Sequence, residues 1–389
     1  MRKSNLVYTF FISVLLALGF LRCQKSKGGI LVDNTVYIPL PKKVISPKDN
    51  PTTPEKVALG KLLFYDPILS GNKDVACATC HHPEFGYAEL IDLSIGVNGV
   101  GLSSKRRFKT DNDIPFVKRN SQSILNAAFN GIEISGAYHP EKAPMFWDLR
   151  AQSLEEQALL PIKTFEEMRG HDFSEAIILD TIVKRLQNIP EYVGHFEKVF
   201  ETSEAITSTN LAKAIAAFER SLVSNNSRFD QYMAGDSTAL SLSEKTGFQL
   251  FKKAKCTNCH SGPMFSDYKI HVLGVPENEK LGYVDDGFEK NFGFRTPSLR
   301  NLSSTAPYMH NGTFKDLEDV LQFYKDLSSG LSKNDQVDKA KLDPLLKEVD
   351  IKVMDMKPII SFFNSLNDDS FDKTIPKEVP SKLPVGGDI

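Results

Sequence analysis

Two short segments of the chain carry two cysteines and a histidine in the same order, Cys77-x-x-Cys80-His81 and Cys256-x-x-Cys259-His260. Thiols at this spacing can bond covalently to the edge of a porphyrin, and the histidine that follows can ligate its iron. The alternative for two cysteine pairs is one zinc site with four thiolates. The pairs are far apart in the chain and each has a histidine in the haem position, which favours two c-type haems with His81 and His260 as proximal ligands.

Length and composition indicate a globular protein with a substantial core. The chain has 389 residues, 41% of them hydrophobic and 25% charged, which fits one large or two medium domains. The formal net charge is −2, so no basic surplus points to a nucleic acid as a partner.

The first 23 residues have the pattern of an export signal. Arg2 and Lys3 precede an apolar stretch over 6–21 that is short for a membrane span. Cys23 then resembles the lipidated first residue of a bacterial lipoprotein. Because Arg22 stands where a small residue is usual, ordinary cleavage or an uncleaved anchor are the alternatives. We therefore expect an exported, periplasmic protein, anchored to a membrane if Cys23 is lipidated, with four cysteines for two haems and none for disulfides.

The hydrophobic pattern predicts a mainly α fold with two cytochrome c-like haem domains and long loops. Residues 24–52 are expected to form a tether or a wrapping arm. The haem domains are expected over 53–204 and 205–375, followed by a peripheral tail over 376–389. A capped helix, from Thr53-Pro54 in one domain and near Ser243-Glu244 in the other, leads into each haem motif. Further helices are predicted over 153–160, 173–186, 191–200, 211–222, 317–324 and 356–366.

The residues around both motifs resemble the bacterial di-haem cytochrome c peroxidase family and its MauG-like branch. The stretches that carry the resemblance are 119–121, 146–150, 155–157, 161–168, 297–301 and 305–310. The resemblance covers about 53–366 and implies that peroxide reacts at the amino-terminal haem and that electrons enter through the carboxy-terminal haem. The implied partners are hydrogen peroxide and a small electron-donor protein, a cytochrome c or a copper protein. A homodimer is left open.

The resemblance also implies roles for four residues. Glu167 falls at the position of the family's distal acid–base, where partial desolvation would raise the carboxyl pKa. Gln157 matches the companion amide, and Trp147, the sole tryptophan, matches an electron relay between the haems. Arg150 is expected to pair with a haem propionate. Without the family, Glu167 would be read as half of a solvated acidic pair and Trp147 as a core residue.

The first haem is expected to keep one face open. Where the family places a distal histidine this chain has Val97, and valine cannot ligate iron. We therefore predict a five-coordinate iron that needs no reductive activation. His82 and His139 are the alternatives, and an ordinary surface position is the simpler interpretation of both.

The resemblance makes Tyr324 the second axial ligand of the second haem. It lies fourteen residues after His310, where the peroxidases have Met and the MauG-like branch has Tyr. A phenolate favours ferric and higher states, whereas a thioether favours ferrous iron. Met309 is the rival ligand, and packing is the plain alternative for Tyr324.

A calcium site between the domains is matched by Asn120, Thr305 and Pro307, through one side-chain amide and backbone carbonyls.

The leading function is then a periplasmic di-haem c peroxidase. The alternatives are a MauG-like oxidase that applies peroxide-derived oxidising equivalents to a protein or other organic substrate, and a non-catalytic di-haem electron carrier.

Overall fold

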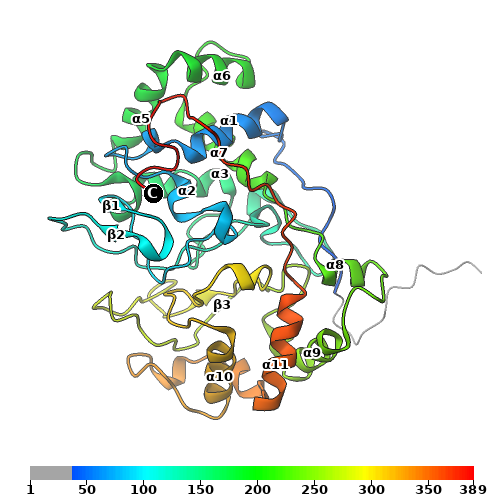
Figure 1. Ribbon diagram of the computed structural model, residues 1–389. Helices are drawn as coiled ribbons and strands as arrows, with labels where there is room; N and C mark the ends of the chain where they lie inside the picture. The colour runs from blue at the N-terminus through cyan, green and yellow to red at the C-terminus, as the bar shows by residue number, and fades with distance from the viewer. Residues whose placement is uncertain (1–36) are drawn as a thin grey trace, which may run out of the picture.

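The computed structural model describes residues 37–389 as a mainly helical chain in two lobes (Figure 1). The predicted signal over 1–23, with Cys23, and the start of the 24–52 segment lie outside the described residues. The expected mainly α class is confirmed, because the strands described form only two short antiparallel pairs. These are β1 (Gly99–Val100) with β2 (Arg107–Phe108), and β3 (Ile270–His271) with β4 (Phe294–Arg295). Within 37–389, no helix is long and apolar enough to cross a membrane.

The N lobe is built from the helices before residue 222. They are α1 (Pro54–Tyr65), α2 (Cys77–Cys80), α3 (Leu154–Gln157), α4 (Leu160–Lys163), α5 (Ile178–Gln187), α6 (Pro190–Phe200) and α7 (Ser208–Ser221). Thr53 caps α1 as predicted, since its hydroxyl accepts a hydrogen bond from the Lys56 amide. Helix α1 crosses α7 very closely at Gly60, where a Cβ would overlap the carbonyl oxygen of Ala214. Glycine at this position is what allows the two helices to pack.

The C lobe repeats this construction with α8 (Arg228–Met233), α9 (Leu242–Lys253), α10 (Leu317–Ser328) and α11 (Val353–Asn364). Helix α9 is capped by Ser241 rather than near Ser243, because Ser241 and Glu244 exchange hydrogen bonds in a capping box. Helix α9 crosses α11 at Gly247, where a Cβ would overlap the carbonyl oxygen of Pro358. Aromatic rings of Phe229, Phe248, Phe251, Phe265 and Phe362 pack edge to face around this crossing.

Two predicted helices differ from those observed. The helix expected over 153–160 is split into α3 and α4, because Pro161 in the first turn of α4 has no amide hydrogen to continue a longer helix. The helix expected over 173–186 begins at Ile178. The ends of the other predicted helices agree to within three residues with those of α6, α7 and α11. Helix α10 begins as predicted at residue 317 but continues to Ser328.

Residues 37–52 form a wrapping arm and connect the lobes. Tyr37 packs on the phenylalanines of the C lobe core, and the Leu40 amide donates to Asp230 in α8. Further along, the Asn50 side chain donates to Glu155 in α3, at 2.7 Å. The arm therefore contacts both lobes before α1 begins (Figure 1).

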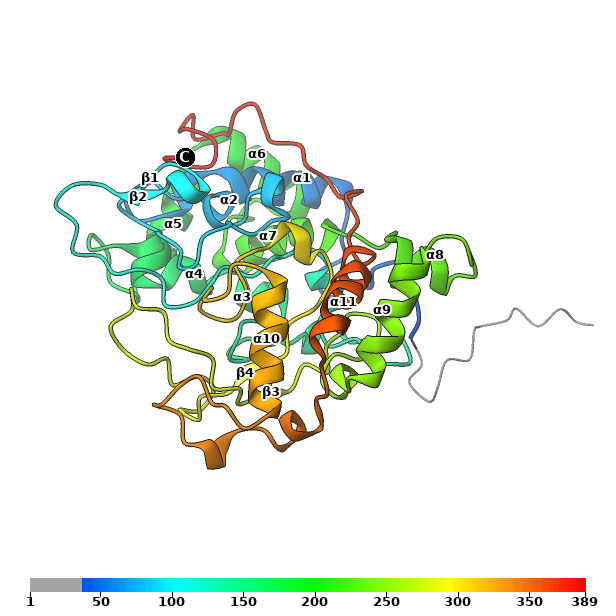
Figure 2. The ribbon, with the colours of Figure 1, turned by 60° about the horizontal axis from the view of Figure 1, so that its bottom comes forward.

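The carboxy-terminal segment returns from α11 across the N lobe (Figure 2). The Tyr87 hydroxyl donates to the Asp372 carbonyl, and the Thr79 hydroxyl donates to the Gly386 carbonyl, both at 2.7 Å. Since Thr79 lies between the two cysteines of the first motif, the tail braces that motif. The expected tail over 376–389 stays a prediction, and composition did not reveal that its backbone accepts from a residue 307 positions earlier.

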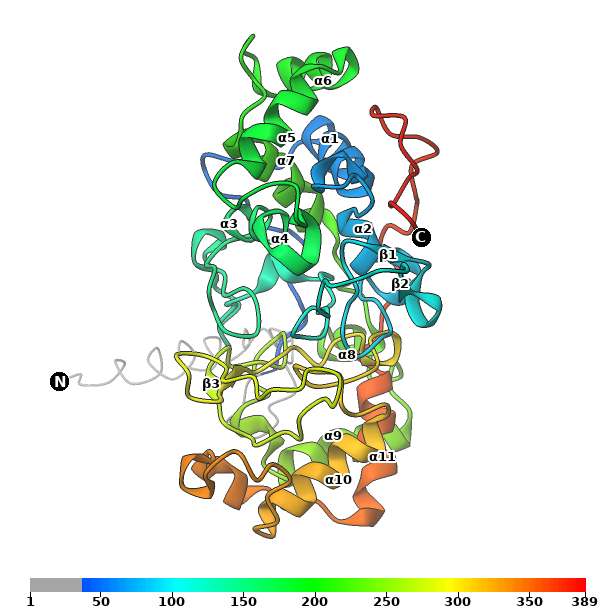
Figure 3. The same ribbon diagram turned by 90° about the vertical axis from the view of Figure 1, so that its left-hand side faces the viewer.

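The predicted domain limit at 204/205 stays a prediction. Helix α7 follows this limit in sequence and packs on α1, whereas α8 places Phe229 in the core of the C lobe. Figure 3 shows the two lobes stacked end to end, with the segments between them at the waist of the molecule.

Candidate functional site

A continuous cavity of about 560 Å³ connects the two motifs. All six cysteines and histidines of the motifs line it: Cys77, Cys80, His81, Cys256, Cys259 and His260. Largely apolar walls with a few inward polar groups suit a flat macrocycle. The fold thus brings together the two motifs that sequence reasoning singled out.

Both motif histidines are oriented in the same way. Nδ1 of His81 donates to the Tyr87 carbonyl at 3.1 Å, and Nδ1 of His260 donates to the Phe265 carbonyl at 2.9 Å. Tyr87 and Phe265 each have a left-handed backbone, with φ of 55° and 53°. Burial lowers the pKa of both imidazoles, so each keeps a free Nε2 lone pair for a metal. These observations show that the residues present fit two c-type haems.

Glu167 and Gln157 both line the cavity. Glu167 lies on a short π-helix, Phe165–Arg169, and burial raises the pKa of its carboxyl to about 7. Burial also raises the pKa of the Cys80 thiol, with a further contribution from the Glu167 charge, which places Glu167 near the first motif. The Gln157 side-chain oxygen is buried and has no hydrogen-bond partner among the described residues. An acid of near-neutral pKa and an unused amide acceptor therefore face the same space.

Val97 is fully buried in the apolar core of the N lobe, and its amide donates to the Glu167 carbonyl at 3.1 Å. Neither alternative histidine lines the cavity. His139 is exposed, as the simpler interpretation holds. A surface position for His82 is wrong, because its Nδ1 accepts from the Glu84 amide and its ring is buried.

Trp147 lies between the lobes. Its Nε1 donates to the Asn120 carbonyl at 3.0 Å, and its ring meets His310 edge-on at 6.5 Å between centroids. His310 in turn stacks on Phe294 at 3.6 Å. This buried aromatic chain is compatible with both interpretations of Trp147, as core residue and as relay.

His310 is a candidate functional residue that the sequence did not single out as such. Its imidazole lines the cavity, burial lowers its pKa to about 3, and its Nε2 has no partner among the described residues. The stretch 305–310, which carries part of the family resemblance, was the signal in the sequence that could have found it.

Two arginines line the cavity near Trp147. Arg150 lies over the Phe146 ring at 3.6 Å and pairs with Asp148 at 2.8 Å, while remaining 38% exposed. Its pairing with a propionate stays a prediction. Arg119 also pairs with Asp148, at 2.6 Å, and holds Asp285 of the C lobe with two hydrogen bonds of 2.5 and 2.9 Å. A bidentate arginine pair thus fixes the two lobes beside the tryptophan.

Tyr324 and Met309 both line the cavity and share one apolar cluster. Burial raises the pKa of the Tyr324 phenol, so the free side chain is protonated. A ferric iron would supply the positive charge that stabilises the phenolate. That Tyr324, and not Met309, is the second axial ligand of the second haem stays a prediction.

The three residues matched to calcium line the same cavity. Asn120, Thr305 and Pro307 line the cavity, and the Asn120 amide donates to the His310 carbonyl at 2.7 Å. The Asn120 side chain donates its Nδ2 to the Ile91 carbonyl, which leaves Oδ1 as an acceptor. Oxygen donors of this kind suit Ca²⁺, and its binding stays a prediction.

Comparisons with known proteins agree with this geometry. A family model described as "Di-haem cytochrome c peroxidase" matches residues 54–238. The chain is 36% identical over 289 residues to methylamine utilization protein MauG of Methylorubrum extorquens, covering 73% of this chain and 72% of that protein. It is 34% identical to cytochrome-c peroxidase IdrP1 of a Pseudomonas species, covering 85% of each. A crystal structure of a MauG-like protein associated with microbial copper homeostasis superposes with a TM-score of 0.67 at 27% identity, covering 88% of this chain and 96% of that one.

Proposed function

Because this chain belongs to the MauG-like di-haem cytochrome c peroxidase family, we propose that it reduces hydrogen peroxide at the first haem with electrons delivered through the second. The family implies two c-type haems. The observation that supports the assignment of roles is the joint placement of Glu167 and Gln157 in the cavity near the first motif.

The proton chemistry falls to Glu167. Peroxide reduction consumes two electrons and two protons per H₂O₂ and yields two waters. When bound, the haem supplies the iron at which the oxygen–oxygen bond is reduced. Glu167, as a carboxylate, takes a proton from the incoming peroxide and returns it to the leaving oxygen, and its pKa near 7 suits both roles. Gln157 orients the peroxide through its free amide.

Trp147 provides the electron path in this proposal. The indole is fixed by its bond to Asn120 and lies against His310 from the C lobe, so it bridges the lobes at a defined position. The electrons come from a small donor protein, a cytochrome c or a copper protein, which makes the periplasm the expected location. Calcium at Asn120, Thr305 and Pro307 would brace the same bridge.

A second candidate is an oxidase that applies the oxidising equivalents of peroxide to a protein or another organic substrate. Tyr324 at the second haem favours it, because a phenolate stabilises the oxidised iron. Replacing Tyr324 by Met should raise the second midpoint potential, whereas Met309→Leu should leave it in place. The reverse result would make Met309 the ligand.

Steady-state turnover separates these functions. The holoprotein is mixed with H₂O₂ and a reduced c-type cytochrome, and cytochrome oxidation is followed by absorbance. We expect two cytochromes oxidised per peroxide, with turnover dependent on Glu167. Peroxide consumption without cytochrome oxidation would favour the oxidase, and no reaction with peroxide at all would overturn both functions.

A further inference from the structure

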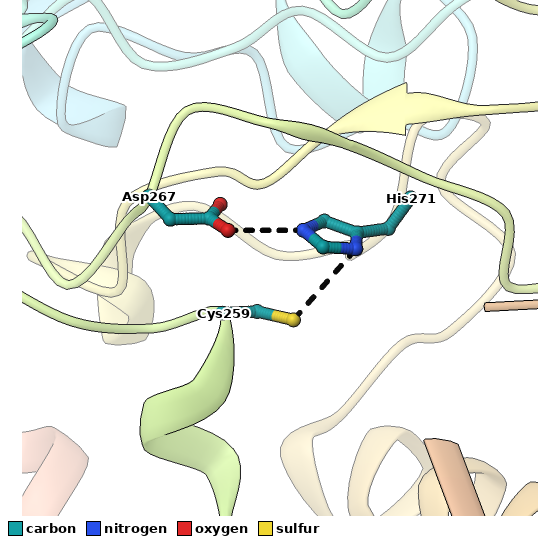
Figure 4. A group of neighbouring side chains, drawn as sticks. All are labelled: Cys259, Asp267 and His271. Atoms are coloured by element: carbon teal, nitrogen blue, oxygen red, sulfur yellow. Dashed lines mark hydrogen bonds and ion pairs between the residues drawn. The ribbon is translucent and has the colours of Figure 1, made fainter. Parts of the chain in front are cut away.

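A buried histidine beside the second motif has no part in the chemistry proposed above. His271 ends β3, with its Nε2 3.1 Å from Asp267 and its Nδ1 2.6 Å from Asp343. Figure 4 shows one ring nitrogen joined to the Asp267 carboxylate and the other, Nδ1, joined to the sulfur of Cys259 at 3.9 Å. Cys259, His271 and Asp343 all line the cavity. The group is therefore at the place where the second macrocycle would be attached.

The hydrogen bonds determine the charge of His271. Each ring nitrogen faces a carboxylate oxygen, and an ionised carboxylate can only accept, so both nitrogens carry a hydrogen. His271 is therefore an imidazolium held between two carboxylates, and the group carries a net charge of about −1. The side chains of His271, Asp267 and Asp343 are 9%, 11% and 17% exposed, so solvent screens these charges poorly.

The backbone holds the charges in place. The Asp267 amide donates to the Cys259 carbonyl at 2.8 Å, and the Asp343 amide donates to the Val272 carbonyl at 2.9 Å. The first carboxylate is thus tied to the haem motif and the second to the strand that carries His271. These bonds fix the backbone positions from which the two carboxylates extend toward His271.

The same donor types would also suit a zinc ion, since Cys259, Asp267 and His271 cluster within a few ångströms. Metal binding needs a lone pair on an imidazole nitrogen, and both nitrogens here are donors to carboxylates on opposite sides of the ring. The Cys259 sulfur is committed to the porphyrin. The geometry thus favours fixed charges over a metal site.

We propose that Asp267, His271 and Asp343 form a fixed charge group that tunes the reduction potential of the second haem. The inference rests on the proposed function, because it takes the second haem to be attached at Cys256 and Cys259. Ferrous haem carries one positive charge fewer than ferric haem. A nearby cation therefore favours the ferrous form and a nearby anion favours the ferric form. His271 raises the potential, and the two carboxylates lower it.

Two substitutions that change the charge in opposite directions test this. His271→Gln removes the cation and should lower the midpoint potential of the second haem, whereas Asp343→Asn removes an anion and should raise it. We expect each to change the ferrous-to-ferric ratio at fixed potential by about tenfold, or about 59 mV for one electron. The holoenzyme is titrated spectroelectrochemically at pH 8, where both carboxylates are ionised.

The same titration contains its own reference. The midpoint of the first haem should stay in place in both variants. His139→Gln and Asp335→Asn repeat the same chemical changes at exposed positions that do not line the cavity and should leave both midpoints unchanged.

Shifts of opposite sign at the second haem support the proposal. Shifts of the same sign, or no shift in either variant, overturn it, because a loosened pocket would move both variants in one direction. If His271→Gln does not load haem, Asp343→Asn decides alone, and its potential must rise. The titration does not depend on turnover. If the potentials shift in opposite directions but the protein does not reduce peroxide, the proposed function fails and this inference stands.

Discussion

The two haem regions share a scaffold and differ in the charges around it. In each, a helix crosses a partner at a glycine, Gly60 or Gly247, and then leads into the motif. In each, the motif histidine donates to the carbonyl of a residue with a left-handed backbone, Tyr87 or Phe265. The repeated parts therefore fix a proximal histidine, and they do not distinguish a haem that reacts with peroxide from one that transfers electrons.

The two regions differ in the acidic residue that lies two positions after Tyr87 and Phe265. In the N lobe this position is Glu89, whose buried carboxyl oxygens are without hydrogen-bond partners in the described structure. In the C lobe it is Asp267, which is paired with His271. Burial raises the pKa of Glu89 to about 7. Burial also acts to raise the pKa of Asp267, but the hydrogen bonds from His271, Thr296 and Lys269 together outweigh it and lower that pKa. One region holds acids that can exchange protons near neutral pH, and the other holds permanent charges.

The largest effect is expected when the proton chemistry of the first region is removed. Glu167→Gln keeps the size of the side chain and should lower kcat/KM for peroxide by about 100-fold or more, since general acid–base catalysis contributes at least that much. Glu166→Gln, the neighbouring carboxylate, is the matched control and should change little. Stopped-flow mixing with peroxide measures both, and equal rates for Glu167→Gln and the wild type would remove Glu167 from the mechanism.

Glu89 should make the stability of the N lobe depend on pH. Because its folded pKa of about 7 exceeds the unfolded value, the native state binds the proton more tightly, so stability falls as pH rises from about 4.5 to 7. Glu89→Gln should remove up to about 3 kcal/mol of this fall. Urea unfolding at pH 5 and pH 8 measures it.

The partner variant Asp267→Asn should show the opposite sign. A lowered folded pKa stabilises the native state at pH values above the unfolded pKa, and that stabilisation is lost on acidification, so urea unfolding at pH 5 and pH 3 measures it. The contrast between the two regions would be broken if both variants responded to pH in the same way.

The shared scaffold predicts equal damage in both lobes. Gly60→Ala and Gly247→Ala should each lower the free energy of unfolding by about 1–3 kcal/mol, because the new methyl group overlaps a backbone carbonyl. Gly194→Ala in α6, where a Cβ meets nothing within 4 Å, should instead stabilise by about 0.5–1 kcal/mol. Thermal unfolding followed by circular dichroism compares the three, and a tolerated alanine at only one crossing would show that the lobes are packed differently.

The pH profile of turnover tests the protonation state of Glu167. Glu167 must be ionised to accept the peroxide proton, so kcat/KM should fall about tenfold per pH unit below a pKa of about 7 and level off above it. The profile should lose this step in Glu167→Gln. If kcat/KM instead rises toward acid pH, Glu167 does not act in its ionised form and the proposed role is wrong.

Local signals in the sequence predicted the fold well and the charge groups poorly. The CxxCH spacing, the Thr53 cap and the helical periodicity depend on neighbours a few residues away, and the structure contains the corresponding elements. Asp343 is 72 residues from His271, and Gly386 is 307 residues from Thr79. No periodicity or composition links such pairs, so the tuning group and the bracing tail could be recognised only in three dimensions.

The family resemblance predicted which residues line the site, but not the contacts that hold them there. Glu167, Gln157, Trp147 and Tyr324 all line the cavity, which the family pattern anticipated without stating what holds them. Their supports, such as the bidentate Arg119–Asp285 pair, come from separate loops of both lobes. Sequence order alone does not show which loops meet.

We propose that one haem has an open face and that the other is ligated on both sides. An electron paramagnetic resonance spectrum of the resting ferric protein, with a pyridine haemochrome assay for the haem content, tests it most directly. We predict two c-type haems per chain, one with a high-spin signal and one with a low-spin signal. Two low-spin signals of equal intensity, or fewer than two haems per chain, would contradict the account.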